Sequence, residues 1–238
     1  MSPIRFTLPA VALGMLLAAG AFAAPMNVNL TFGSLPSAQG WTYVASGAHA
    51  GVAEAAIFSV AGGTTLTMNS MGQSNGVSGG SIFYQVLNGL TTTEAKQIRV
   101  RARCLQAEGS AGAPGGIGGF VFGFATGATQ FAFGLTPTQV TALTSSGTAV
   151  VPGTYDNSTA FHDYIFDWTS AASWRIYRDG TLIYTGSSGF AVAVNRLFLG
   201  DGTGGANANG EITSYQFVQD LATPVETGTW GRLKATYR

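Results

Sequence analysis

The stretch SWRIYRDGTLIYTG, from Ser173 to Gly186, spells out a β-hairpin. Aromatic and branched apolar residues run up to Asp179-Gly180 and resume directly after this pair. An Asp-Gly pair supplies the two positive φ angles that a type I′ turn requires. The sequence therefore predicts two antiparallel strands, Ser173–Arg178 and Thr181–Thr185, joined by a two-residue loop.

Period-two alternation continues on both sides of the hairpin, and no long stretch shows helical periodicity. Short strands separated by Gly, Ser, Thr and Asn are typical of a sandwich or barrel. A short helical turn is expected at Thr136–Leu143, near Pro137. The other expected strands are Asn27–Phe32, Trp41–Ala45, Ala55–Val60, Thr64–Met68, Ser81–Val86, Gln97–Leu105, Gly119–Ala125, Thr129–Gly134, Thr148–Val151, Phe161–Thr169, Arg196–Gly200 and Glu211–Val218.

Three pieces in this order, FHDYIFDW from Phe161, the hairpin, and NRLFLGDGTGGANANGEITSYQF ending at Phe217, resemble the laminin-G-like (LamG-like) branch of the concanavalin A-like superfamily. The resemblance implies an all-β, antiparallel two-sheet sandwich of jelly-roll type over most of Asn27–Asp220. It implies carbohydrate or glycoconjugate binding, or cell-surface adhesion, without turnover. The same fold hosts glycoside hydrolases, polysaccharide lyases and structural or matrix-assembly modules without a small ligand, and these remain alternatives.

Only 9% of the 238 residues are charged, and the formal net charge is zero. Nucleic acids and anionic membranes need clustered Lys and Arg, so this composition argues against both as partners. It is compatible with a neutral polysaccharide, or with packing against other cell-surface or matrix proteins.

The N-terminus is typical of a secretory signal peptide. Arg5 precedes an apolar region at Val11–Ala19, and Ala21-Phe22-Ala23 places small residues where signal peptidase reads them. We expect residues 1–23 to be removed on export to the cell surface or the medium, without stable membrane insertion afterwards. An uncleaved anchor is the alternative. A single domain is expected at 24–222, and residues 223–238 are expected to be a sorting or docking tail, or a disordered terminus.

The single cysteine, Cys104, excludes an internal disulfide. It ends an alternating run in which Ile98, Val100 and Ala102 share its face, while three arginines share the other. Cys104 is therefore expected to be a small buried hydrophobe and not a reactive thiol.

Catalytic groups are sparse. Glucanases of the superfamily carry paired carboxylates on one strand in an E-x-D-x-E or E-x-D-x-x-E pattern, and neither pattern occurs here. The nearest pair, Asp163 and Asp167, has Ile165 between its members, so both are read as solvent-facing and only weakly as catalytic. His162 is expected on the opposite face, as a hydrogen-bonded core residue and only secondarily as a catalytic one.

Oxygen donors gather between Gly200 and Glu211. Asp201, Asn207, Asn209 and Glu211 are candidate calcium ligands in a glycine-permitted loop, because calcium binds six to eight oxygens. Relatives in the superfamily often hold calcium near a sandwich rim. The alternative is a turn held by Asx hydrogen bonds.

Sugar binding favours exposed aromatic rings with a polar edge. Candidate ligand-binding residues are Trp41, Tyr155, Arg175 and Tyr184, with Arg175 and Tyr184 expected as cross-strand neighbours in the hairpin. The alternating phenylalanines of Gly119–Ala125 and Thr129–Gly134 are expected to form core.

Overall fold

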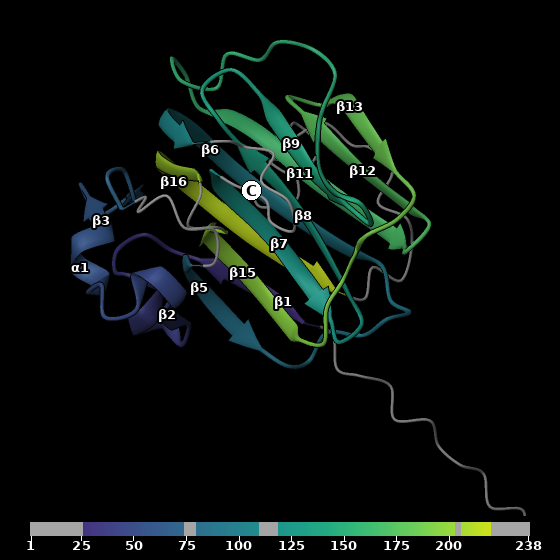
Figure 1. The fold of residues 1–238 in the computed structure, drawn as a ribbon, viewed down its shortest axis with the longest axis horizontal. Coiled ribbons are helices and arrows are strands. Elements are labelled where there is room, and N and C mark those ends of the chain that lie inside the picture. The colour runs from purple at the N-terminus through teal and green to yellow at the C-terminus, as the bar shows by residue number, and fades with distance from the viewer. Residues whose placement is uncertain (1–25, 74–79, 110–118, 203–205, 220–238) are drawn as a thin grey trace, which may run out of the picture.

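The computed structural model describes residues 26–73, 80–109, 119–202 and 206–219. Two antiparallel eight-stranded sheets, named sheet A and sheet B, are stacked face to face (Figure 1). The predicted all-β, two-sheet sandwich of jelly-roll type is confirmed. The predicted signal peptide and C-terminal tail lie outside the described residues. In the part of the chain that is described, no helix combines the length and apolarity needed to span a bilayer.

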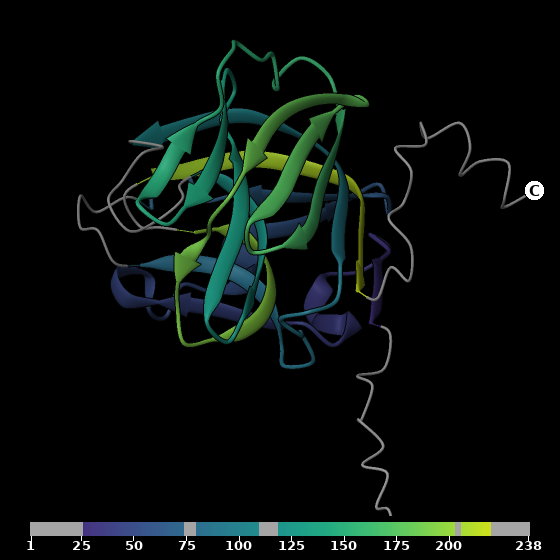
Figure 2. The same cartoon turned by 90° about the vertical axis from the view of Figure 1, so that its right-hand side faces the viewer.

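Sheet A is built around two 14-residue strands that run side by side and appear as long curved ribbons in Figure 2. In order across the sheet, the strands are β13 (Thr181–Gly186), β12 (Ser173–Arg178), β11 (His162–Ser170), β6 (Lys96–Gly109), β16 (Ala206–Gln219), β4 (Thr65–Asn69) and β3 (Phe58–Ala61), with β1 (Asn27–Leu30) paired to the C-terminal part of β16.

Sheet B contains a four-stranded meander followed by strands from distant parts of the chain. In order across the sheet, the strands are β10 (Gly147–Val150), β9 (Val140–Thr144), β8 (Thr129–Leu135), β7 (Phe120–Thr126), β15 (Asn195–Asp201), β5 (Ser81–Leu87) and β2 (Thr42–Ser46), with β14 (Phe190–Ala191) paired to β8. Three short helices, η1 (Pro36–Gln39), η2 (Gly47–His49) and α1 (Glu54–Ile57), flank β2 and β3.

Aromatic side chains from the inner faces of both sheets fill the core. The predicted phenylalanine faces of β7 and β8 are buried. Phe124 of sheet B lies edge-on to Phe166 and Trp168 of sheet A, at centroid distances of 5.9 and 6.0 Å. Burial of each such ring contributes about 1.5–3 kcal/mol. Cys104 is fully buried in the same core, which confirms its reading as a small hydrophobe.

The hairpin turn has the predicted geometry, since Asp179 and Gly180 have φ angles of 50° and 80°. Two other local predictions are wrong. The expected helical turn at Thr136–Leu143 contains β9 from Val140 onward, and the expected strand at Ala55–Val60 begins inside α1.

Candidate functional site

Asp163 and Asp167 both point to the outer face of sheet A. They alternate with buried Tyr164 and Phe166 along β11, as expected. Arg101 on β6 donates from Nη1 to Asp163 Oδ2 at 3.0 Å, which forms an ion pair. Asp163 therefore has a cation partner of its own on the neighbouring strand.

Asp167 lies in a less hydrated setting. Burial raises its pKa, against the opposing effects of a hydrogen bond from Gln97 and the positive charges of Arg175 and Arg99. Asp163 and Asp167 have the i, i+4 spacing on one face of β11, but each carboxylate is held by a side chain of β6: Asp163 by Arg101 and Asp167 by Gln97, at 3.4 Å. A catalytic role for this pair stays a prediction.

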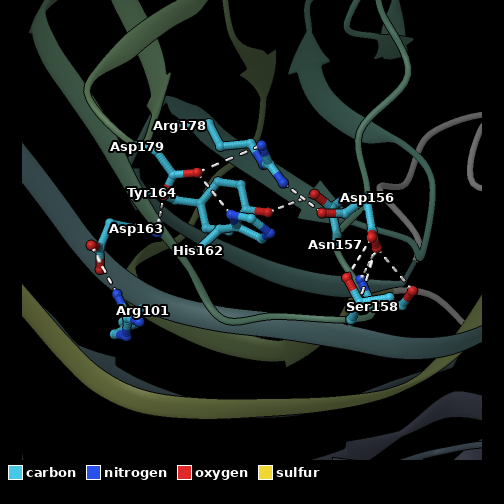
Figure 3. Close-up of polar contacts among 10 residues, drawn as sticks. Arg101, Asp156, Asn157, Ser158, His162, Asp163, Tyr164, Arg178 and Asp179 are labelled. Carbon is cyan, nitrogen blue, oxygen red and sulfur yellow. Dashed lines mark hydrogen bonds and ion pairs between the residues drawn. The ribbon is translucent and has the colours of Figure 1, made fainter.

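His162 lies half-buried at one end of the sandwich, where β11 begins (Figure 3). Its Nδ1 lies 2.7 Å from Asp179 Oδ2, and Asp179 Oδ1 accepts the backbone N–H of Asp163 at 3.0 Å. Burial raises the pKa of Asp179, but these hydrogen bonds and the charges of His162 and Arg178 outweigh it and lower the pKa. The expected hydrogen bond of His162 is present, whereas its expected core position is wrong.

Asn157 is the buried centre of the same end of the molecule. Its Nδ2 donates to the carbonyls of Thr136 and Gln139 at 2.8 and 2.9 Å, and its Oδ1 accepts from the Tyr164 hydroxyl at 2.7 Å. Its carbonyl accepts the N–H of Cys104 at 2.8 Å. Asn157 thereby joins β6 and β11 of sheet A to the turn before β9 of sheet B.

Asp156, next to Asn157, closes a polar turn at the surface (Figure 3). Its carboxylate accepts hydrogen bonds from the side chains and backbone N–H groups of Ser158 and Thr159. The hydrogen bond from the Thr159 hydroxyl is the largest cause that lowers the Asp156 pKa, followed by the other three donors. This network orders the 156–159 segment.

The four candidate ligand-binding residues do not form one patch. Trp41 is buried edge-on to Tyr215 at 5.7 Å, and Tyr155 is half-buried with its hydroxyl donating to the Pro152 carbonyl. Arg175 is exposed on the outer face of sheet A, but Tyr184 packs against Trp174 at 5.2 Å on the inner side.

The expected pairing of Arg175 with Tyr184 is wrong because the hairpin contains a β-bulge. Tyr177 pairs with Leu182 and Ile176 pairs with Tyr184, so one extra residue lies in β13. Arg175 therefore pairs with Thr185. A single inserted residue moves every later side chain of a strand to the other face.

The candidate calcium ligands are also divided. Asp201 ends β15 and accepts the Ser70 hydroxyl at 2.6 Å, while Glu211 pairs with Arg103 at 2.7 Å. Asn207, Asn209 and Glu211 lie within β16, so the expected loop is shorter than predicted.

Two amide oxygens in this region are nevertheless unsatisfied. Asn207 Oδ1 and Asn209 Oδ1 are buried and accept no hydrogen bond from the residues that the structure describes. Asn207 pairs with Glu108 of β6 and donates from Nδ2 to its Oε1 at 2.9 Å. Since no group of three His, Cys, Asp or Glu forms among the described residues, a cation here would depend on such amide oxygens.

The outer face of sheet B carries a cluster that the sequence reading missed. The guanidinium of Arg196 lies over the rings of Phe83 and Phe198, 4.6 and 5.0 Å from their centroids. Its Nη2 donates to Gln130 Oε1 at 3.2 Å. The sequence of β15 does indicate this face, because Arg196 and Phe198 alternate with the core residues Leu197 and Leu199.

Comparisons with known proteins are distant. No protein-family model and no curated protein matches the chain. A solved lichenase from a mouse hindgut metagenome is 18% identical and covers 84% of this chain and 99% of its own, with a TM-score of 0.48. The β-glucanase of Bacillus licheniformis is 12% identical and covers 80% of this chain and 97% of its own, with a TM-score of 0.49. The binding domain of Paraclostridial Mosquitocidal Protein 1 is 12% identical, and the match covers 76% of this chain and 46% of that protein's chain, with a TM-score of 0.46. These similarities are too distant to carry a statement about the chemistry of this chain.

Proposed function

We propose that the chain is an exported, non-catalytic carbohydrate-binding protein whose glycan lies on the outer face of sheet B. The observation that carries this proposal is the row of side chains around Arg196. Gln85 and Gln130 are half-exposed beside it, and Leu87 is 51% exposed next to it on β5. Amide and guanidinium groups bond sugar hydroxyls, and an apolar side chain packs on the C–H face of a sugar ring.

The absence of acids from this row supports binding without turnover. Among the described residues of the strands of sheet B, those that point outward include no Asp or Glu. A two-carboxylate mechanism on this face would need groups from elsewhere in the chain.

Calcium binding belongs to the same proposal. Asn207 and Asn209 are kept from the ligands predicted from sequence, and Glu108, which was not predicted, takes the place of Asp201 and Glu211. The two partnerless amide oxygens support it, because buried polar atoms without a hydrogen bond are uncommon and hard cations prefer oxygen ligands. The ion would stabilise the fold near the start of β16.

A glycoside hydrolase or lyase is the second candidate function. The observation that favours it is Asp167, whose raised pKa would suit a proton donor on the outer face of sheet A. Release of reducing or unsaturated sugar ends that Asp167→Asn abolishes would establish this candidate in place of the binding proposal.

The test is depletion of the purified protein from solution by insoluble polysaccharides, with calcium and with EDTA. Depletion should be lost in a double variant, Gln85→Ala with Gln130→Ala, and retained in Gln216→Ala on the outer face of sheet A. No depletion by any polymer would overturn the proposal. Concentration-dependent size in light scattering would then favour a structural or matrix-assembly role.

Export is tested separately, by the N-terminus of the protein recovered from its host. The proposed cleavage gives a chain that begins at Ala24. An intact Met1 in the recovered protein would contradict it.

A further inference from the structure

Arg196 differs from the other cations of the described residues in having no carboxylate partner there. Arg101, Arg103 and Arg178 form ion pairs with acids. The charges of Arg99 and Arg175 favour the ionised form of Asp167, and the charge of Glu94 favours the protonated form of Lys96. Within the described residues, Arg196 instead contacts a neutral amide and two aromatic rings.

The guanidinium is also partly removed from water. Its Nε is buried and has no hydrogen-bond acceptor in the described part of the chain, and burial alone lowers the pKa of the group. A charged group that is partly desolvated and left without a counter-charge is costly for a folded protein. Cation–π contacts offset only about 0.5–2 kcal/mol of such a cost.

Two glycines make room for the aromatic support of Arg196. A Cβ atom at Gly123 would lie 2.7 Å from Cζ of Phe198, and one at Gly200 would lie 2.8 Å from Cβ of Phe83. Both distances are shorter than van der Waals contact. A larger residue at Gly123 would therefore displace the Phe198 ring, and one at Gly200 would push β15 away from β5 at Phe83. The two glycines thus allow Phe83 and Phe198 to pack edge-to-face, at an interplanar angle of 68°, beside Arg196.

We propose that Arg196 binds an oxyanion on the glycan, either the carboxylate of a uronic acid or a sulfate ester. The inference rests on the proposed function and names the class of glycan. An oxyanion supplies the missing counter-charge and acceptors in the plane of the guanidinium, where charge-assisted hydrogen bonds are strongest. Gln85 and Gln130 lie one and two strands away from the same group and would bond the neighbouring hydroxyls.

The experiment measures binding of the full chain to three kinds of polymer: polygalacturonate, carrageenan, and neutral laminarin. Binding to polygalacturonate but not carrageenan identifies a carboxylate site, and the reverse identifies a sulfate site. Either affinity should fall with added salt and should drop about ten- to a hundredfold in Arg196→Gln, the loss expected for one charged hydrogen-bonding group.

The matched control is Arg175→Gln, which removes the same charge from the outer face of sheet A and should leave affinity unchanged. Arg196→Lys should lie between wild type and Arg196→Gln, because it keeps the charge but loses the planar fork. The salt dependence of the wild type tests the proposal even where a variant fails to fold.

Outcomes separate this inference from the proposed function. Binding to laminarin alone, or binding to any polymer that is independent of salt and of Arg196, overturns the oxyanion site and leaves carbohydrate binding intact. Binding to none of these three polymers, and to none of the insoluble polysaccharides used to test the proposed function, overturns both the oxyanion site and carbohydrate binding.

Discussion

The Tyr164 hydroxyl of sheet A donates a 2.7 Å hydrogen bond to Oδ1 of Asn157, whose Nδ2 donates to two carbonyls beside sheet B. Both residues are fully buried. All the hydrogen-bonding groups of the Asn157 side chain are therefore used between the two layers, in a place that water does not reach.

Replacing Asn157 with Ala should destabilise the protein by about 2–3 kcal/mol, because it removes two hydrogen bonds to the carbonyls of Thr136 and Gln139 and takes the Oδ1 acceptor away from the buried Tyr164 hydroxyl. Urea unfolding followed by tryptophan fluorescence measures this change. Tyr164→Phe, which leaves only Oδ1 unpaired, should cost about 1–2 kcal/mol. Equal losses for the two variants would contradict the assignment of Asn157 as the shared centre.

Asp179 should make the fold sensitive to acid. Its pKa is lower in the folded protein than the value of about 4 expected for an unfolded chain. Its stabilising effect is therefore complete above about pH 4 and is lost as the pH falls through the lowered folded value. The difference in unfolding free energy between wild type and Asp179→Asn should shrink on acidification below pH 4.

Asn is the suitable replacement because it tolerates the positive φ of 50° at this turn position. A difference between wild type and Asp179→Asn that stays constant from pH 6 to pH 2.5 would show that the Asp179 charge does not act as described.

The sheets were predictable because their signal is local. In β11 and β7, alternation of aromatic and polar or small residues is enough to assign an inner face. The Asp179-Gly180 pair likewise fixed a turn, since few residues adopt consecutive positive φ angles. Neither inference required knowledge of what packs against the strand.

The missed features depend on contacts between distant segments. The bulge in β13 carries no sequence mark, yet it moves Tyr184 from the face of Arg175 to the core. Asn157 reads as an ordinary turn residue until the β8–β9 turn is brought beside it. Arg196 is recognisable as a binding residue only from the fold, which brings Phe83, more than 100 positions earlier in the chain, under its guanidinium.

Lys96 should make the protein more stable in mild alkali. Its side chain is fully buried, with Nζ 4.3 Å from the Trp168 ring centroid and donating to the Glu94 carbonyl at 2.6 Å. Burial lowers its pKa to about 8, against the opposing charge of Glu94. Between pH 8 and the unfolded value near 10.4, the unfolded chain binds more protons, so stability rises with pH.

Relative to Lys96→Met, the wild type should therefore gain about 2 kcal/mol in unfolding free energy between pH 7 and pH 10. Chemical denaturation at several pH values measures this gain. Arg101→Met removes a cation whose side chain is 47% exposed and should show no such slope. A flat difference for Lys96→Met would mean that the buried amine is not desolvated as its surroundings indicate.

Cys104 should be inert until the protein unfolds. The thiol is fully buried and donates to the Gln106 carbonyl at 3.4 Å. Burial raises its pKa to about 12, against a smaller opposing effect of the Gln106 backbone. Disulfide reagents attack the thiolate, which is both rare and shielded here. Ellman's reagent at pH 8 should therefore leave the native protein unmodified and should react with one thiol per chain in denaturant.

The matched control is Leu87→Cys in a Cys104→Ala background, which exposes a thiol on β5 and should react at once in the native state. Rapid native labelling of Cys104 would mean that β6 opens locally, and the inner face of sheet A would then be less stable than its close packing implies.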